Sequence, residues 1–127
     1  MPELPPGTSL AVTAEALFLV NLLLVPGVAF ALLALLYLRR IGTAPPLARC
    51  HLRQTFFASL WAGVLLVAVN GLILALGGYD APNTWVILVL YFTTCHATLV
   101  LLGVLGLAKA MAGQPFRYPL IGRPCEM

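Results

Sequence analysis

The segment Thr84–Ala110, TWVILVLYFTTCHATLVLLGVLGLAKA, decides the fold class of this chain. It is almost continuously apolar, and as a helix rising ~1.5 Å per residue it is long enough to cross a hydrocarbon core of ~30 Å. Two stretches of the same character precede it, at residues 13–38 and 51–76. We therefore predict an all-α integral membrane protein with three transmembrane helices.

The connections between these segments are rich in residues that end helices. Gly42 and Pro45-Pro46 separate the first segment from the second, and the turn formers of residues 77–83 separate the second from the third. The short second connection predicts a tight antiparallel hairpin between spans two and three. The chain then forms a single transmembrane domain, flanked by an outer tail at residues 1–12 and a cytoplasmic tail at residues 113–127.

Composition and charge separate this chain from soluble and nucleic-acid-binding proteins. Apolar residues make up 61% of the chain and charged residues 9%, which leaves no polar faces to cover a soluble core. The net charge of +3 comes from basic residues that are split between two short segments rather than gathered in one patch. We expect lipids as neighbours and no nucleic-acid partner.

The positive charges predict the orientation in the membrane, because loops rich in Lys and Arg are retained in the cytoplasm. All seven flank the first connection or follow the third span: Arg39, Arg40, Arg49, Arg53, Lys109, Arg117 and Arg123. This pattern places the N-terminus outside and the C-terminus inside a bacterial inner membrane. Ala29-Phe30-Ala31 is similar to a signal-peptide cleavage site, but no basic residue precedes the first apolar segment.

The three cysteines have no spacing typical of a metal or thioredoxin-like motif, and their odd number does not favour a disulfide framework. We interpret Cys50, Cys95 and Cys125 as reduced structural thiols.

His96 lies near the middle of the third span, where an ionisable side chain marks a candidate functional site. It could be a haem ligand, a metal ligand or a proton relay, or a neutral imidazole bonded across a helix interface. His51 lies about half a bilayer away in depth, so one haem cannot join the two histidines. We predict no metal site and no cofactor held by this chain alone, while a haem shared with a partner at His96 stays an alternative.

Other polar residues fall within the apolar segments. Asn21 and Asn70 share a depth and are expected to form a hydrogen bond between spans one and two. Pro26 is expected to kink the first helix, and Glu15 is expected near the outer surface.

Small residues at helical spacing predict close helix packing. They are Gly103, Gly106 and Ala110 in the third span, and Ser59 and Gly63 in the second. We expect the face of the third span, continued by the cytoplasmic tail, to pack against a larger membrane protein.

Two stretches carry a family resemblance, ARCHLRQ at residues 48–54 and FRYPLIG at residues 116–122. They resemble a family of small uncharacterised bacterial membrane proteins that is remotely grouped with the channel-like component of the chloroplast inner-envelope import machinery. His51 and Gln54 match a His-x-x-Gln motif of that family, and Tyr118-Pro119-Leu120 matches its tail motif, whereas residues 55–58 depart from its pattern. The resemblance implies a helical membrane domain.

Both motifs lie at the predicted cytoplasmic boundary. There we expect one polar cluster, formed by His51, Arg53, Gln54, Arg117 and Tyr118. The tail, which carries three prolines, is expected to lie extended along the interface and to help dock a partner.

These features favour a non-catalytic accessory subunit of a larger membrane complex. No nucleophile with its base, phosphate loop or paired-carboxylate site stands out, so we do not expect an enzyme. A transport component that oligomerises and a haem- or quinone-binding electron-transfer subunit using His96 are the alternatives.

Overall fold

The computed structural model describes residues 3–125, and every regular element in this range is helical. In chain order the elements are α1 (Thr8–Leu23), α2 (Val28–Arg40), α3 (Pro46–Gly63), the π-helical turn η1 (Val64–Ala68), α4 (Val69–Gly77) and α5 (Pro82–Met111). The predicted all-α class is confirmed. The outer ends of the two expected tails, residues 1–2 and 126–127, lie outside the described residues.

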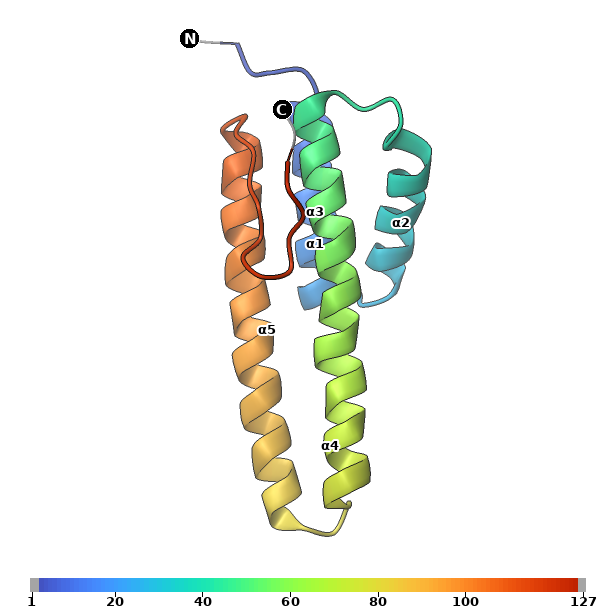
Figure 1. Ribbon diagram of the computed structural model, residues 1–127, viewed down its shortest axis with the longest axis vertical. Coiled ribbons are helices and arrows are strands. Elements are labelled where there is room, and N and C mark those ends of the chain that lie inside the picture. Colours follow the sequence, from blue (N-terminus) through green and yellow to red (C-terminus); the bar gives the residue numbers. More distant parts are fainter. Residues whose placement is uncertain (1–2, 126–127) are drawn as a thin grey trace.

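Two long apolar helices dominate the molecule (Figure 1). α3, η1 and α4 follow one another without a break and form one helix, Pro46–Gly77, of 32 residues, and α5 has 30 residues. Both are long and apolar enough to cross a membrane. They run antiparallel around a short turn, where the Trp85 indole N–H donates to the Tyr79 carbonyl at 2.8 Å. The predicted hairpin of residues 51–76 and 84–110 is therefore present.

The expectation of one helix over residues 13–38 is wrong. α1 ends at Leu23, the chain reverses, and α2 runs back beside α1 (Figure 1). Pro26 has no amide hydrogen to continue the helix, and Gly27 adopts a positive φ of 86° that favours glycine. The Pro-Gly pair therefore makes a turn where we expected only a kink.

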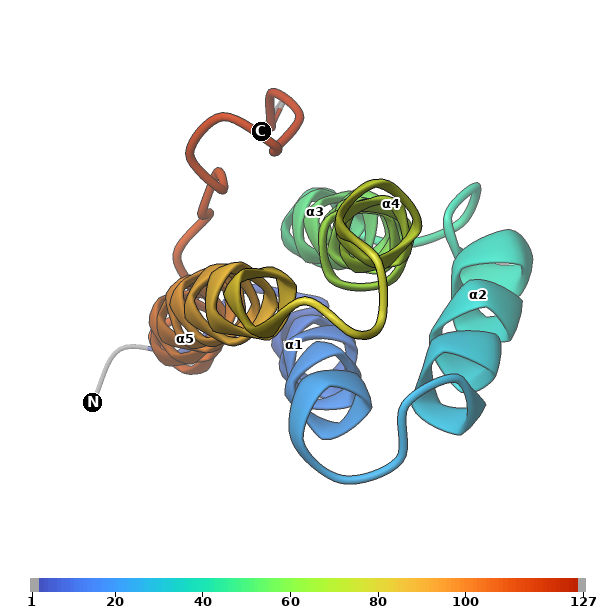
Figure 2. The ribbon, with the colours of Figure 1, turned by 90° about the horizontal axis from the view of Figure 1, so that it is seen from below.

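The hairpin of α1 and α2 has its open end beside the start of α3 and the end of α5. A Cβ placed on Gly7 would lie 2.9 Å from Ala48 of α3, and one on Gly113 would lie 2.5 Å from Pro5. The tip of the hairpin lies near the middle of α5, because the Leu22 carbonyl accepts a hydrogen bond from His96. The hairpin thus covers only about half the length of the long helices (Figure 1), and the view along their length shows α1 between α5 and α2 (Figure 2).

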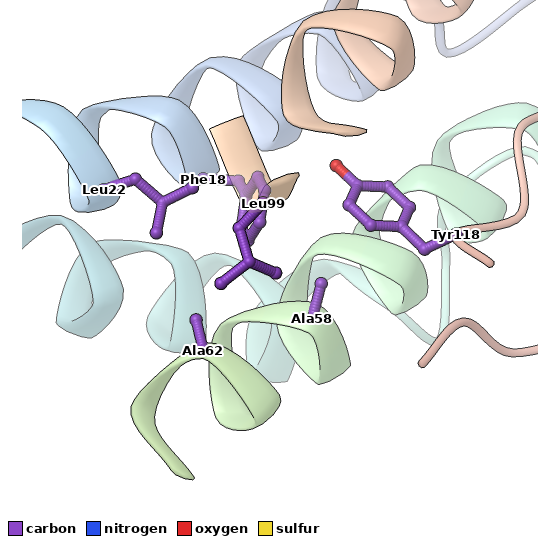
Figure 3. Close-up of a cluster of buried hydrophobic side chains, with 6 residues drawn as sticks. All are labelled: Phe18, Leu22, Ala58, Ala62, Leu99 and Tyr118. Atoms are coloured by element: carbon purple, nitrogen blue, oxygen red, sulfur yellow. The ribbon is translucent and has the colours of Figure 1, made fainter. Parts of the chain in front are cut away.

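The C-terminal tail, which we expected to lie extended along the membrane interface, folds back against the helices (Figure 1). Its Tyr118 is fully buried. Figure 3 shows the core cluster that this ring joins, which consists of Phe18 and Leu22 of α1, Ala58 and Ala62 of α3, Leu99 of α5 and Tyr118. The tail therefore packs along the side of the half that carries the basic residues.

Candidate functional site

A pocket of about 380 Å³ lies at the tip of the α1–α2 hairpin, against α3, η1 and α5. Most of its walls are apolar, and they include Phe30, Leu60, Leu66, Val67 and Phe92. Three polar side chains also line it: Asn21, Ser59 and His96. Apolar walls with a few polar groups are typical of small-molecule sites, and this volume lies within their usual range.

His96 is fixed in this pocket by two contacts. Its Nε2 lies 2.9 Å from the Leu22 carbonyl oxygen, and its ring stacks on Phe92 with centroids 5.5 Å apart. The carbonyl is free to accept because its partner in a continued helix would be the amide of residue 26, which is a proline. The hydrogen bond across a helix interface that we expected for His96 is present.

The expected bond between Asn21 and Asn70 does not form. Asn21 Oδ1 accepts from the Gly27 amide at 2.9 Å and so supports the start of α2. Asn70 Nδ2 donates to the Leu66 carbonyl at 2.6 Å, which lies in the π-helical turn. Each asparagine bonds to the backbone of its own segment instead of to the other one, and among the described residues the buried Asn70 Oδ1 has no hydrogen-bond partner.

Ser59 and Gly63, which we expected to mark a packing face, both line the pocket. Ser59 is almost completely buried, and among the described residues its hydroxyl has no hydrogen-bond partner. A Cβ on Gly63 would meet nothing within 4 Å. The π-helical turn begins at the next residue, and such turns are frequent at functional sites. Gly63 therefore leaves open space at this wall of the pocket and does not make the close helix contact that we expected.

A second polar site lies at the basic end of the molecule. His51 Nδ1 is 2.7 Å from Glu15 Oε1, its Nε2 is 2.8 Å from the Gln114 carbonyl oxygen, and the Tyr118 hydroxyl is 2.6 Å from Glu15 Oε2. The Glu15, His51 and Tyr118 side chains are all fully buried. Glu15, which we expected near the opposite surface, belongs to this cluster because α1 begins at the same end as α3.

The hydrogen-bond partners determine how many protons this cluster holds. A carbonyl oxygen only accepts, so His51 Nε2 carries a hydrogen, and one further proton lies between His51 Nδ1 and Glu15 Oε1. Burial, followed by the neighbouring Glu15 carboxyl, raises the pKa of Tyr118, so this hydroxyl keeps its proton and donates. The cluster is neutral overall wherever the shared proton resides, which lowers the cost of burying it.

Gln54 holds the tail through both ends of its amide. Its Oε1 accepts from the backbone amides of Tyr118 at 3.3 Å and Arg123 at 3.1 Å, and its Nε2 donates to the Arg123 carbonyl and to Cys125 Sγ. The Arg123 guanidinium lies 4.1 Å from the centre of the Phe57 ring. The expected cluster therefore forms from His51, Gln54 and Tyr118.

Arg53 and Arg117 do not join that cluster. Arg117 is exposed, and Arg53 lies beside a disulfide between Cys50 and Cys125. The interpretation of these two cysteines as free thiols is thus wrong for this structure, whereas Cys95 is free. Their separation of 75 residues along the chain gave no local motif to detect.

The small-residue face of α5 packs inside this molecule. A Cβ on Gly103 would lie 2.7 Å from the Leu19 side chain, and one on Gly106 would lie 2.5 Å from the Glu15 carboxyl. Ala110 is fully buried with Ala11 and Leu47. These residues admit α1 to the surface of α5, so the face that we expected to bind a partner is already covered.

Within residues 3–125 no group of three or more His, Cys, Asp or Glu side chains could hold a metal ion. Neither a protein-family model, nor a curated protein, nor a solved structure matches this chain. The resemblance drawn from its two short motifs therefore stays a prediction.

Proposed function

We propose that this chain is an integral protein of the bacterial inner membrane whose two long helices span the bilayer. The α1–α2 hairpin enters from the basic end and turns back at mid-depth, beside His96. Large apolar side chains exposed along η1, α4 and α5 support this placement, including Val67, Leu72, Val89 and Leu101. Both termini then lie on the cytoplasmic side, unlike the outer N-terminus of a chain with three spans.

The basic residues and the disulfide lie at the same end of the molecule but indicate different compartments. Lys and Arg are retained in the cytoplasm, whereas disulfides persist in oxidising compartments. We give more weight to the seven basic residues, which act together, and expect Cys50 and Cys125 to be reduced in the cell while Gln54 still holds the tail.

A reporter active only in the cytoplasm, fused in turn to each end, tests this topology. Activity of both fusions is expected. A silent N-terminal fusion with an active C-terminal fusion would restore the topology with three spans, and silence of both would place the basic end outside, in agreement with the disulfide.

The chain acts, in this proposal, as a membrane-embedded binding module for a small apolar molecule, held in the pocket at the hairpin tip. The observation that carries this function is the pocket of about 380 Å³ with the buried, unpartnered Ser59 hydroxyl on its wall. A polar group left unpaired in an apolar interior is costly, and a ligand would supply its partner.

The test compares two glycines of the same long helix. Gly63 lines the pocket, so leucine there would fill part of it, whereas Gly71 does not line the pocket and its Cβ would meet nothing within 4 Å. Native mass spectrometry of the purified proteins should detect a retained small molecule in the wild type and in Gly71→Leu, and its loss in Gly63→Leu. Equal retention by all three proteins would contradict the proposal.

An accessory subunit of a larger membrane complex is the second candidate. The observation in its favour is the exposed apolar surface of the hairpin formed by α4 and α5, which no other part of residues 3–125 covers. Polar substitution of Leu90, which is 64% exposed, should release a partner if a protein covers this surface. Co-purification of the same chains with the wild type and with Leu90→Gln would show that no partner binds through Leu90 and would contradict this candidate.

A further inference from the structure

We infer that the pocket at the hairpin tip selects a neutral lipid-soluble molecule that carries a hydroxyl group, with Nδ1 of His96 as the acceptor. This inference rests on the proposed binding function and names the chemical class of its ligand.

The neutrality of the ligand follows from the composition and depth of the pocket. The side chains that line it carry no formal charge, apart from an imidazole at a depth where a charged form is costly. A phosphate or carboxylate group would find no cation there, and an ammonium group would find no anion. The ligand therefore presents an uncharged polar group.

The requirement for a ligand group that donates a hydrogen follows from the protonation of His96. Because the Leu22 carbonyl only accepts, the hydrogen of the neutral imidazole is on Nε2, and Nδ1 is left as an acceptor. Among the described residues 3–125, the one hydrogen bond of the His96 ring is the bond at Nε2. A ligand that bonds to Nδ1 has to donate a hydrogen, which a hydroxyl can do and a ketone or an ether cannot.

Two further groups fit the same ligand. The buried Ser59 hydroxyl can donate to the oxygen of a ligand hydroxyl, and it can also turn to accept. The stack of His96 on Phe92 fixes the plane of the imidazole and so the direction of Nδ1. The wall reaches the lipid-facing surface at Leu60 and Val67, which are 43% and 72% exposed, so the apolar part of a ligand can enter from the bilayer.

The experiment uses two probes, 4-dodecylphenol and its methyl ether, in which a methyl group replaces this hydrogen. Their binding to the full chain in lipid nanodiscs is measured by native mass spectrometry, with empty nanodiscs as the background. The wild type should bind the phenol about five- to tenfold more tightly than the ether, the usual effect of one hydrogen bond. Equal binding of the two probes would overturn the inference.

Variants at positions 95 and 96 of α5 distinguish the role of the His96 side chain from a general effect of substitution in this helix. His96→Phe keeps a ring against Phe92 but has no acceptor. It should therefore bind the phenol and the ether about equally tightly. His96→Gln can donate to the Leu22 carbonyl and still accept, so it should retain the preference even if His96→Phe folds poorly. Cys95→Ala, whose side chain does not line the pocket, should behave as the wild type. A preference that survives in His96→Phe would overturn the role of Nδ1.

Failure of this inference can be told apart from failure of the proposed function. If Gly63→Leu blocks both probes but the wild type does not distinguish them, the pocket binds apolar molecules without selecting a hydroxyl. If Gly63→Leu blocks neither probe, both proposals are wrong.

Discussion

The two halves of this molecule differ in how their apolar side chains are covered. In the half that carries the basic residues, α1, α2, α3, α5 and the tail pack together, and most buried side chains lie there. The other half consists of η1, α4 and α5 alone among the described residues; α4 buries only Asn70, and η1 buries no residue. The first half depends on internal contacts, while the second depends on whatever surrounds it, and the pocket lined by Ser59 and His96 lies where the two meet.

The largest expected effect comes from breaking the polar cluster of the packed half. His51→Ala leaves the buried Glu15 carboxyl without its imidazole partner, which costs about 3–5 kcal/mol of stability. Unfolding of the purified protein in detergent measures this loss. Adding Glu15→Gln to His51→Ala should recover part of it, because a neutral amide is cheaper to bury. Full stability of His51→Ala alone would show that the cluster contributes nothing.

Two glycines should respond to alanine in opposite directions. At Gly106 the new Cβ would lie 2.5 Å from a carboxyl oxygen that His51 and Tyr118 hold in place, so Gly106→Ala should destabilise the protein by about 1–3 kcal/mol. At Gly71 the Cβ meets nothing within 4 Å, and Gly71→Ala should stabilise the helix by about 0.5–1 kcal/mol. Unfolding midpoints of the two variants check both signs, and a stabilising Gly106→Ala would mean that α1 does not pack here.

The sequence predicted the less packed half well and the packed half poorly. Long apolar runs, with breakers at residues 77–83, define the hairpin of the two long helices because hydropathy and turn chemistry act locally. Hydropathy does not distinguish a segment that crosses the membrane from one that enters and returns, so residues 13–38 were predicted as one helix. The Pro26-Gly27 pair was the available signal of a turn.

For each candidate site, too, one part was predicted from the sequence and another part was not. His51, Gln54 and Tyr118 were predicted to meet because two motifs lie at one boundary, but Glu15 was placed at the opposite surface as a consequence of the single first span. The spacing of Gly103, Gly106 and Ala110 predicted close packing without indicating which helix would pack there. Ser59 and His96 were each singled out, yet their meeting in one pocket depends on the hairpin tip, which is a long-range feature.

The smallest expected effect is at Leu72, in the less packed half. A matched substitution of Leu52, in the packed half, tests the comparison directly. Leu52 is fully buried beneath α1 and α2, whereas Leu72 on α4 is 55% exposed. Leu52→Ala removes a side chain from a closed core and should cost about 2–5 kcal/mol, since the cavity it leaves cannot fully collapse. Leu72→Ala removes a side chain that faces lipid or detergent, which fills the space at once, so its effect should stay within about 0.5 kcal/mol. Unfolding of both variants in the same detergent gives the difference. Losses of similar size would mean that the surface of α4 is covered by another chain or a second copy, and that its exposure does not persist in the assembled protein.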